Sequence, residues 1–136
     1  MANSLFNYAR ELAATTGLAW TSGTFKAYLI DTGGGYTFSA ADQYFTSVAA
    51  GAREAGPVTL TTPTATGGAC DADDVTFSAV AAGPTIEAIL IIKFVTNDAD
   101  SPNVAWIDTA TGLPITPNGG DIIVTWDSGT NKIFRV

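Results

Sequence analysis

The segment of residues 86–95, IEAILIIKFV, constrains the fold of this chain more than any other part of its sequence. In an extended strand, side chains alternate between two faces. Here apolar residues occupy both faces, with Ile86, Ala88, Leu90, Ile92 and Phe94 on one and Ile89 and Ile91 on the other. A strand that is apolar on both faces in its middle must be covered on both sides. We therefore predict that it is central to a sheet, or partly covered by a subunit partner.

Further short strand signals follow residue 17, with turn residues between them. Alternating or β-branched runs occur at residues 24–31, 57–62, 74–80, 104–108, 121–126 and 132–136. Because residues 127–130, DSGT, suit a tight turn, the last two strands are predicted to pair as a hairpin. The pattern predicts an all-β domain over residues 18–136, built as a single β-sandwich or jelly roll.

Residues 1–17 are predicted to form a separate helical segment at the N-terminus. Asn3 or Ser4 can cap the helix and Gly17 can end it. The apolar residues that repeat at helical spacing are Leu5, Tyr8, Ala9 and Leu12. A helix of this length is marginal by itself in water, so it must dock on its own sheet or on a neighbouring molecule.

The composition excludes several classes of function. The chain has 136 residues, which fit one domain, with no histidine and one cysteine, so His-dependent catalytic triads and an internal disulfide are impossible. Its formal net charge is −7, and its six basic residues are scattered along the sequence, which argues against nucleic-acid binding. No signal peptide is evident, and the longest apolar stretch, residues 88–92, is too short to span a membrane. We expect synthesis in the cytoplasm and no membrane partner.

Three groups of residues suggest chemistry, and each also has a structural interpretation. Cys70 could be a reactive thiol, but its neighbour Asp71 would not lower its pKa, so a small residue near a turn is favoured. The acidic cluster at residues 71–74 could bind calcium, or its carboxylates could bond backbone amides in solvated turns. Aromatic residues could form a sugar-binding platform or pack in the sheet: Trp20, Trp106, Trp126, Tyr28, Tyr36 and Tyr44. We predict no catalytic residue, no metal site and no cofactor.

Five stretches together resemble a widespread family of small structural proteins of tailed bacteriophages. The C-terminal run is the most specific, through its LPITPNGGDI turn and its IFRV end. The stretches are KAYLIDT at residues 26–32, AGAREAG at 50–56, DADDVTFSAV at 71–80, IEAILIIK at 86–93 and WIDTATGLPITPNGGDIIVTWDSGTNKIFRV at 106–136. Within this group the chain is most similar to capsid decoration, or cement, proteins.

The resemblance implies a non-enzymatic virion protein on the outer surface of the capsid, made in the host cytoplasm. Its expected partners are the major capsid protein, whose capsomers it would bridge and stabilise, and further copies of itself as a dimer or trimer. Phe6, Tyr8 and Leu12 are the candidate contact residues of the N-terminal segment, or alternatively they pack within the chain. The alternatives are a neck, tail or fibre component of the virion, or a carbohydrate-binding module displayed on it.

Overall fold

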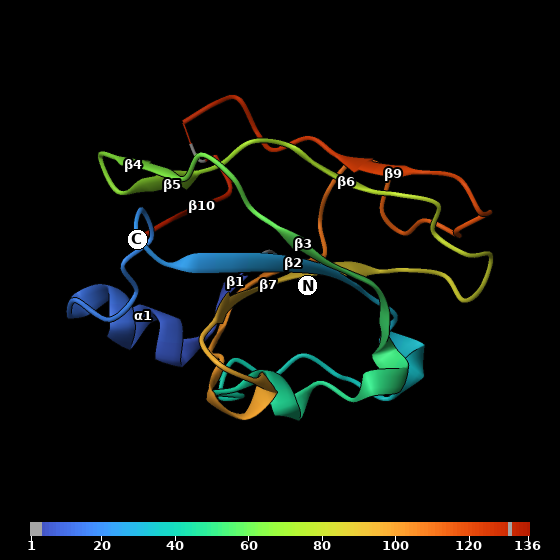
Figure 1. Cartoon of the computed structure of the whole chain (residues 1–136), viewed down its shortest axis with the longest axis horizontal. Coiled ribbons are helices and arrows are strands. Elements are labelled where there is room, and N and C mark those ends of the chain that lie inside the picture. Colours follow the sequence, from blue (N-terminus) through green and yellow to red (C-terminus); the bar gives the residue numbers. More distant parts are fainter. Residues whose placement is uncertain (1–3, 131) are drawn as a thin grey trace.

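The computed structural model describes residues 4–130 and 132–136. In this part of the chain, antiparallel sheets dominate and one short α-helix accompanies them (Figure 1), so the expectation of an all-β fold is confirmed. The strands are β1 (Ser4–Leu5), β2 (Thr24–Ile30), β3 (Arg53–Thr59), β4 (Thr64–Thr66), β5 (Ala69–Asp71), β6 (Val75–Phe77), β7 (Ala88–Phe94), β8 (Asn103–Ile107), β9 (Ile122–Val124) and β10 (Phe134–Arg135). The helices are α1 (Asn7–Ala14) and the 3-10 turns η1 (Thr32–Gly34), η2 (Phe45–Ser47), η3 (Ala50–Ala52) and η4 (Asp98–Asp100).

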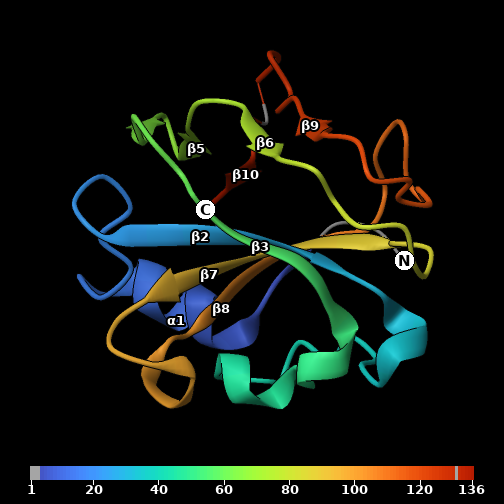
Figure 2. The same cartoon turned by 45° about the vertical axis from the view of Figure 1, so that its right-hand side comes forward.

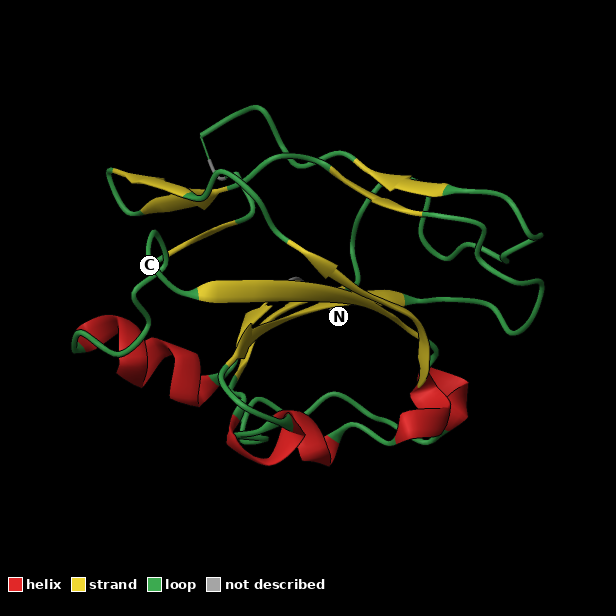
Figure 3. Cartoon of the chain, in the orientation of Figure 1, coloured by secondary structure: helices red, strands yellow, loops and turns green. Residues whose placement is uncertain are grey.

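The described strands form three sheets, of which the largest has five strands in the order β1-β8-β7-β2-β3. The strand β7 therefore lies at the centre of this main sheet, as the sequence predicts. A second β layer, made of the sheet β10-β5-β4 and the ribbon β6-β9, covers one face. The helix α1 and the 3-10 turns cover the other face, as Figure 3 shows in red.

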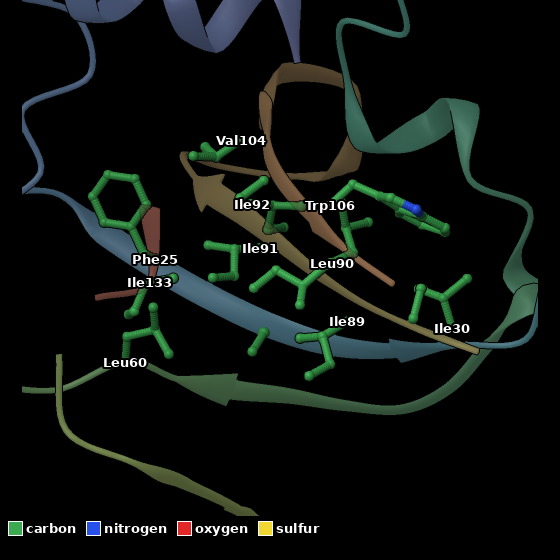
Figure 4. Packing of buried hydrophobic residues seen from close by; sticks show 14 of the residues in the cluster. Phe25, Ile30, Leu60, Ile89, Leu90, Ile91, Ile92, Val104, Trp106 and Ile133 are labelled. Carbon is green, nitrogen blue, oxygen red and sulfur yellow. The ribbon is translucent and has the colours of Figure 1, made fainter. Parts of the chain in front are cut away.

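The register of the main sheet shows how each face of β7 is buried. Ile91 pairs with Ala27 and Ala105 on the face of the second β layer, where the Phe25 ring lies 4.4 Å from that of Trp20. Figure 4 shows Phe25 close to Leu60 and Ile133, which belong to this side of the core. Residues that pair across neighbouring strands lie on the same face of a sheet. Ile91, Ala27 and Ala105 are therefore buried together under the second β layer.

The opposite face of β7 packs against the helical layer. Leu90 pairs with Tyr28 and Trp106. The Tyr28 ring lies 4.5 Å from Phe45 of η2, and the Trp106 ring lies 5.4 Å from Phe38. Both apolar faces of β7 are thus covered within one chain, so the sheet needs no subunit partner to bury them.

Much of the helical layer is irregular backbone, and the guanidinium group of one arginine stabilises it through several contacts. Arg53, at the start of β3, donates hydrogen bonds to the carbonyl oxygens of Phe45 and Val48 and forms a 2.6 Å ion pair with Asp98. Its guanidinium also lies 3.7 Å from the centre of the Phe45 ring. Buried carbonyl groups need such partners. Arg53 therefore ties η2 and η4 to the edge of the main sheet.

Two sequence-based predictions are wrong. The last two strands do not form a hairpin, because β9 pairs with β6 whereas β10 pairs with β5. The helix begins at Asn7, later than predicted, because Leu5 pairs with Ala105 in the main sheet and Phe6 is fully buried. Of the two predicted cap residues, Ser4 lies in β1 and Asn3 lies outside the described residues. The N-terminal segment therefore contributes to the same core as the rest of the chain.

We expect Leu90→Ala to destabilise the fold by about 2–5 kcal/mol, because it opens a cavity between the main sheet and the helical layer. The exposed Val95 offers a control, and Val95→Ala should change the free energy of unfolding by less than about 0.5 kcal/mol. Urea unfolding followed by tryptophan fluorescence measures both values. Equal effects of the two substitutions would contradict the burial of Leu90.

Candidate interaction surface

The three predicted contact residues have different surroundings. Phe6 is fully buried, with its ring 5.1 Å from that of Phe38, so it packs in the core and offers no surface to a partner. Tyr8 and Leu12 are half-buried, and the Tyr8 ring lies 5.6 Å from that of Tyr44. This contact with Tyr44 raises the pKa of Tyr8 through a side-chain hydrogen bond. Tyr8 and Leu12 therefore remain accessible as candidate contact residues, and Phe6 does not.

Next to α1, the edges of two sheets form the walls of a cavity of about 520 Å³ that is open to solvent. The strand β1 is an edge of the main sheet and β10 is an edge of the second β layer, and both contribute to the walls. A neighbouring cavity of about 360 Å³ is lined by Leu5, Arg10, Ala13, Ala14, Arg135 and Val136. Because Leu5, Arg10 and Arg135 line both cavities, we treat the two as one feature and call it the α1–β10 groove.

The groove gathers half of the basic residues of an acidic chain. Arg10, Lys132 and Arg135 line it together with one carboxylate, Asp127. Arg10 and Arg135 stand at opposite ends of the sequence, so the scattered basic residues that the sequence shows become a cluster only through the fold.

The other three basic side chains are occupied elsewhere. Arg53 binds Asp98, Lys93 donates a hydrogen bond to the Gly17 carbonyl, and the Lys26 ammonium lies 3.7 Å from the centre of the Phe94 ring. In the groove, Arg135 is positioned by hydrogen bonds to the carbonyl oxygens of Thr130 and Gly67. Arg10 is exposed, and its guanidinium group has no hydrogen bond or ion pair with any residue that the structure describes.

The acidic clusters act as structural acceptors. Asp73 accepts hydrogen bonds from the hydroxyl groups of Thr61 and Thr62, and Asp74 accepts one from the Trp126 amide. The amides of Asn97 and Thr96 hold the pKa of Asp100 below its usual value. Within the described residues, no group of three or more metal-ligating side chains converges on one point. The interpretation of these acids as turn-stabilising groups is therefore favoured over a calcium site.

The tryptophans do not form an exposed platform for sugars. Trp20, Trp106 and Trp126 are all buried, and their indole nitrogens donate hydrogen bonds to the Asp71 carbonyl, the Asp108 carboxylate and the Asp73 carbonyl, respectively. A sugar-binding aromatic needs an open ring face. Trp106 packs in β8 as predicted, whereas Trp126 is buried but follows the end of β9 and lies outside the strands.

No protein-family model matches the chain, and no curated protein matches it significantly. None of the helices in the described ranges, 4–130 and 132–136, combines the length and the hydropathy of a membrane span.

We expect Phe6→Ala to lower the free energy of unfolding by about 3–5 kcal/mol, because Phe6 fills a fully buried position. Leu12→Ser, at a half-buried position of the adjoining helix, should lower the free energy of unfolding by a clearly smaller amount. Chemical denaturation of both variants measures the difference. If Phe6→Ala were neutral, the N-terminal segment would not belong to the core.

We also expect Cys70 to resist alkylation in the native protein at neutral pH. The thiol is buried in β5, and burial raises its pKa, so the reactive thiolate is scarce. Mass spectrometry after iodoacetamide treatment should show no adduct before unfolding in urea and complete modification after it. Rapid native labelling would contradict this position of Cys70.

Proposed function

We propose that this chain is a structural protein of a tailed-bacteriophage virion, without enzymatic activity, that decorates the outer surface of the capsid. It would bind the major capsid protein, bridge neighbouring capsomers and stabilise the shell. We further propose that its β layers are a variant of the jelly-roll sandwich. The resemblance of five stretches of the sequence to small phage structural proteins is the starting point.

The observation that carries the proposal is the closed core around β7. The stretches KAYLIDT and IEAILIIK correspond largely to β2 and β7, which pair over seven residue positions and are covered from both sides. Such a domain is stiff, because dense packing leaves its strands no freedom to slide. A protein that bridges capsomers must transmit load between them without deforming.

Stabilisation of a shell then follows from linkage. A protein that binds the assembled lattice but not the separate capsomers shifts the equilibrium towards the lattice. Many equivalent sites add small free energies of binding into a large total. The acidic net charge suits the outer surface, because a chain of charge −7 gains nothing from contact with packaged DNA.

We expect the chain to be abundant in purified virions of the phage that encodes it. Quantitative mass spectrometry with isotope-labelled peptides, referred to the major capsid protein, measures its copy number. A lattice decoration protein should be present at a ratio near one to one, or at a simple fraction such as about one third, because its sites repeat with the capsomers.

Other copy numbers would contradict the capsid role in different ways. A count of tens at most would place the chain in the neck, tail or fibres, the main alternative within the virion. Complete absence from particles would overturn the virion role and leave a free binding module. Salt-washed and unwashed particles, compared side by side, control for loosely adhering protein.

A further inference from the structure

A second surface of this chain complements the α1–β10 groove. On the ribbon of β6 and β9, Thr76 pairs with Ile123, whose side chain is 68% exposed. Asp74 directly precedes β6 and Asp121 directly precedes β9, so these two exposed carboxylates lie at opposite ends of the antiparallel ribbon. The residues Val75 and Phe77, on either side of Thr76, are buried in the core. We call the exposed surface formed by Thr76 and Ile123, with Asp74 and Asp121 at its ends, the ribbon patch.

The two surfaces match in charge and in hydrophobicity. The groove offers three cations around apolar atoms of Leu5, Ala13, Ala14 and Val136. The ribbon patch offers an exposed isoleucine with one carboxylate towards each end of the ribbon. Asp74 and Asp121 each receive one backbone hydrogen bond, from Trp126 and Ala79 respectively, which fixes these carboxylates in place at the surface. An apolar centre with fixed charges around it is the arrangement of a specific protein interface.

The two surfaces are centred on different parts of the molecule and approach each other only near Trp126, whose amide donates to Asp74 and whose neighbour Asp127 lines the groove. Figure 1 places α1 and the C-terminus towards one end of the long axis and β9 towards the other, and Figure 2 keeps α1 and β9 on different sides. One molecule therefore cannot join its own groove to its own ribbon patch. A second copy can present its ribbon patch to the groove of the first.

We propose that the α1–β10 groove binds the ribbon patch of a second copy of this chain, in a head-to-tail contact. A twofold dimer through the groove would bring the three cations of one copy close to those of the other, with Asp127 as the only acidic side chain among the described residues lining the groove to offset them, and like charges in close opposition cost several kcal/mol. Head-to-tail contacts propagate until they close, so they produce rings of three or more copies, or filaments. The inference concerns the purified chain and does not depend on the proposed role in a virion.

Two single substitutions at exposed positions test the contact from its two sides. Arg10→Glu inverts a charge in the groove, and Ile123→Lys places a cation in the ribbon patch. Each variant alone should be a monomer by native mass spectrometry and light scattering at about 0.05 M salt, where screening is weak. The wild-type chain should form rings of three or more copies or filaments, with a dissociation constant at least about 100-fold lower than that of either variant.

A mixture of the two variants gives the decisive result. Arg10→Glu retains an intact ribbon patch and Ile123→Lys retains an intact groove, so one copy of each should form a heterodimer that cannot grow further. A wild-type chain that is monomeric, or that stops at a twofold dimer, would overturn the proposal. So would a mixture of variants that stays monomeric.

Matched controls separate the contact from general effects of charge and folding. Arg10→Lys keeps the positive charge of the groove, and Val95→Lys adds a cation at another large apolar residue, which is 51% exposed and lies outside both surfaces. Both should assemble like the wild-type chain, and loss of assembly in Val95→Lys would overturn the assignment of the ribbon patch. Near-UV circular dichroism should be the same for all four variants. Virion copy number remains a separate measurement, so either proposal can fail alone.

Discussion

The need to keep both faces of β7 away from water governs the whole architecture. Ile89 and Ile91 require a layer on one side, and Leu90 and Ile92 require another on the opposite side, so a single two-layered sandwich of regular strands does not satisfy the sequence. The chain supplies β4, β5, β6, β9 and β10 for the first layer and mostly irregular backbone for the second. Irregular backbone at a buried face needs hydrogen-bond partners, and Arg53 provides several of them at once.

The sequence predicted those parts of the fold that depend on local alternation. The central position of β7 follows from its two apolar faces, and β2 and β8 follow from similar short-range patterns. The strand partners of β9 and β10 did not follow, because a tight turn at residues 127–130 is compatible with a hairpin and also with two strands in different sheets. Pairing with β6 brings Ile122 and Val124 beside the buried Val75 and Phe77, and this nonlocal contact favours β6 over β10 as the partner of β9.

The helical layer shows a second limit of sequence patterns. At Gly34, a Cβ atom would lie 2.5 Å from the Gly51 carbonyl oxygen, so this position needs glycine for a close approach between two loops. In the sequence the same residue is part of a run of three glycines, which suggests only a flexible connection. Likewise, the clustering of Arg10 with Arg135 requires β1 and β10 to meet at one cavity, and within the described residues each of these strands has two residues. Such short strands carry almost no periodic signal.

The distribution of charge links the fold to the way copies of the chain can meet. A net charge of −7 makes two copies repel at long range in most orientations, which keeps them apart and soluble. An orientation that places a basic groove against acidic residues of the neighbour escapes this repulsion at short range. In the proposed contact the two effects would act together: the repulsion disfavours nonspecific association, and the groove selects one geometry. Arg53, Lys93 and Lys26 make their contacts away from the groove. Within the groove, Arg135 and Lys132 donate hydrogen bonds to backbone carbonyl groups, so Arg10 is the cation whose side chain is left for a partner.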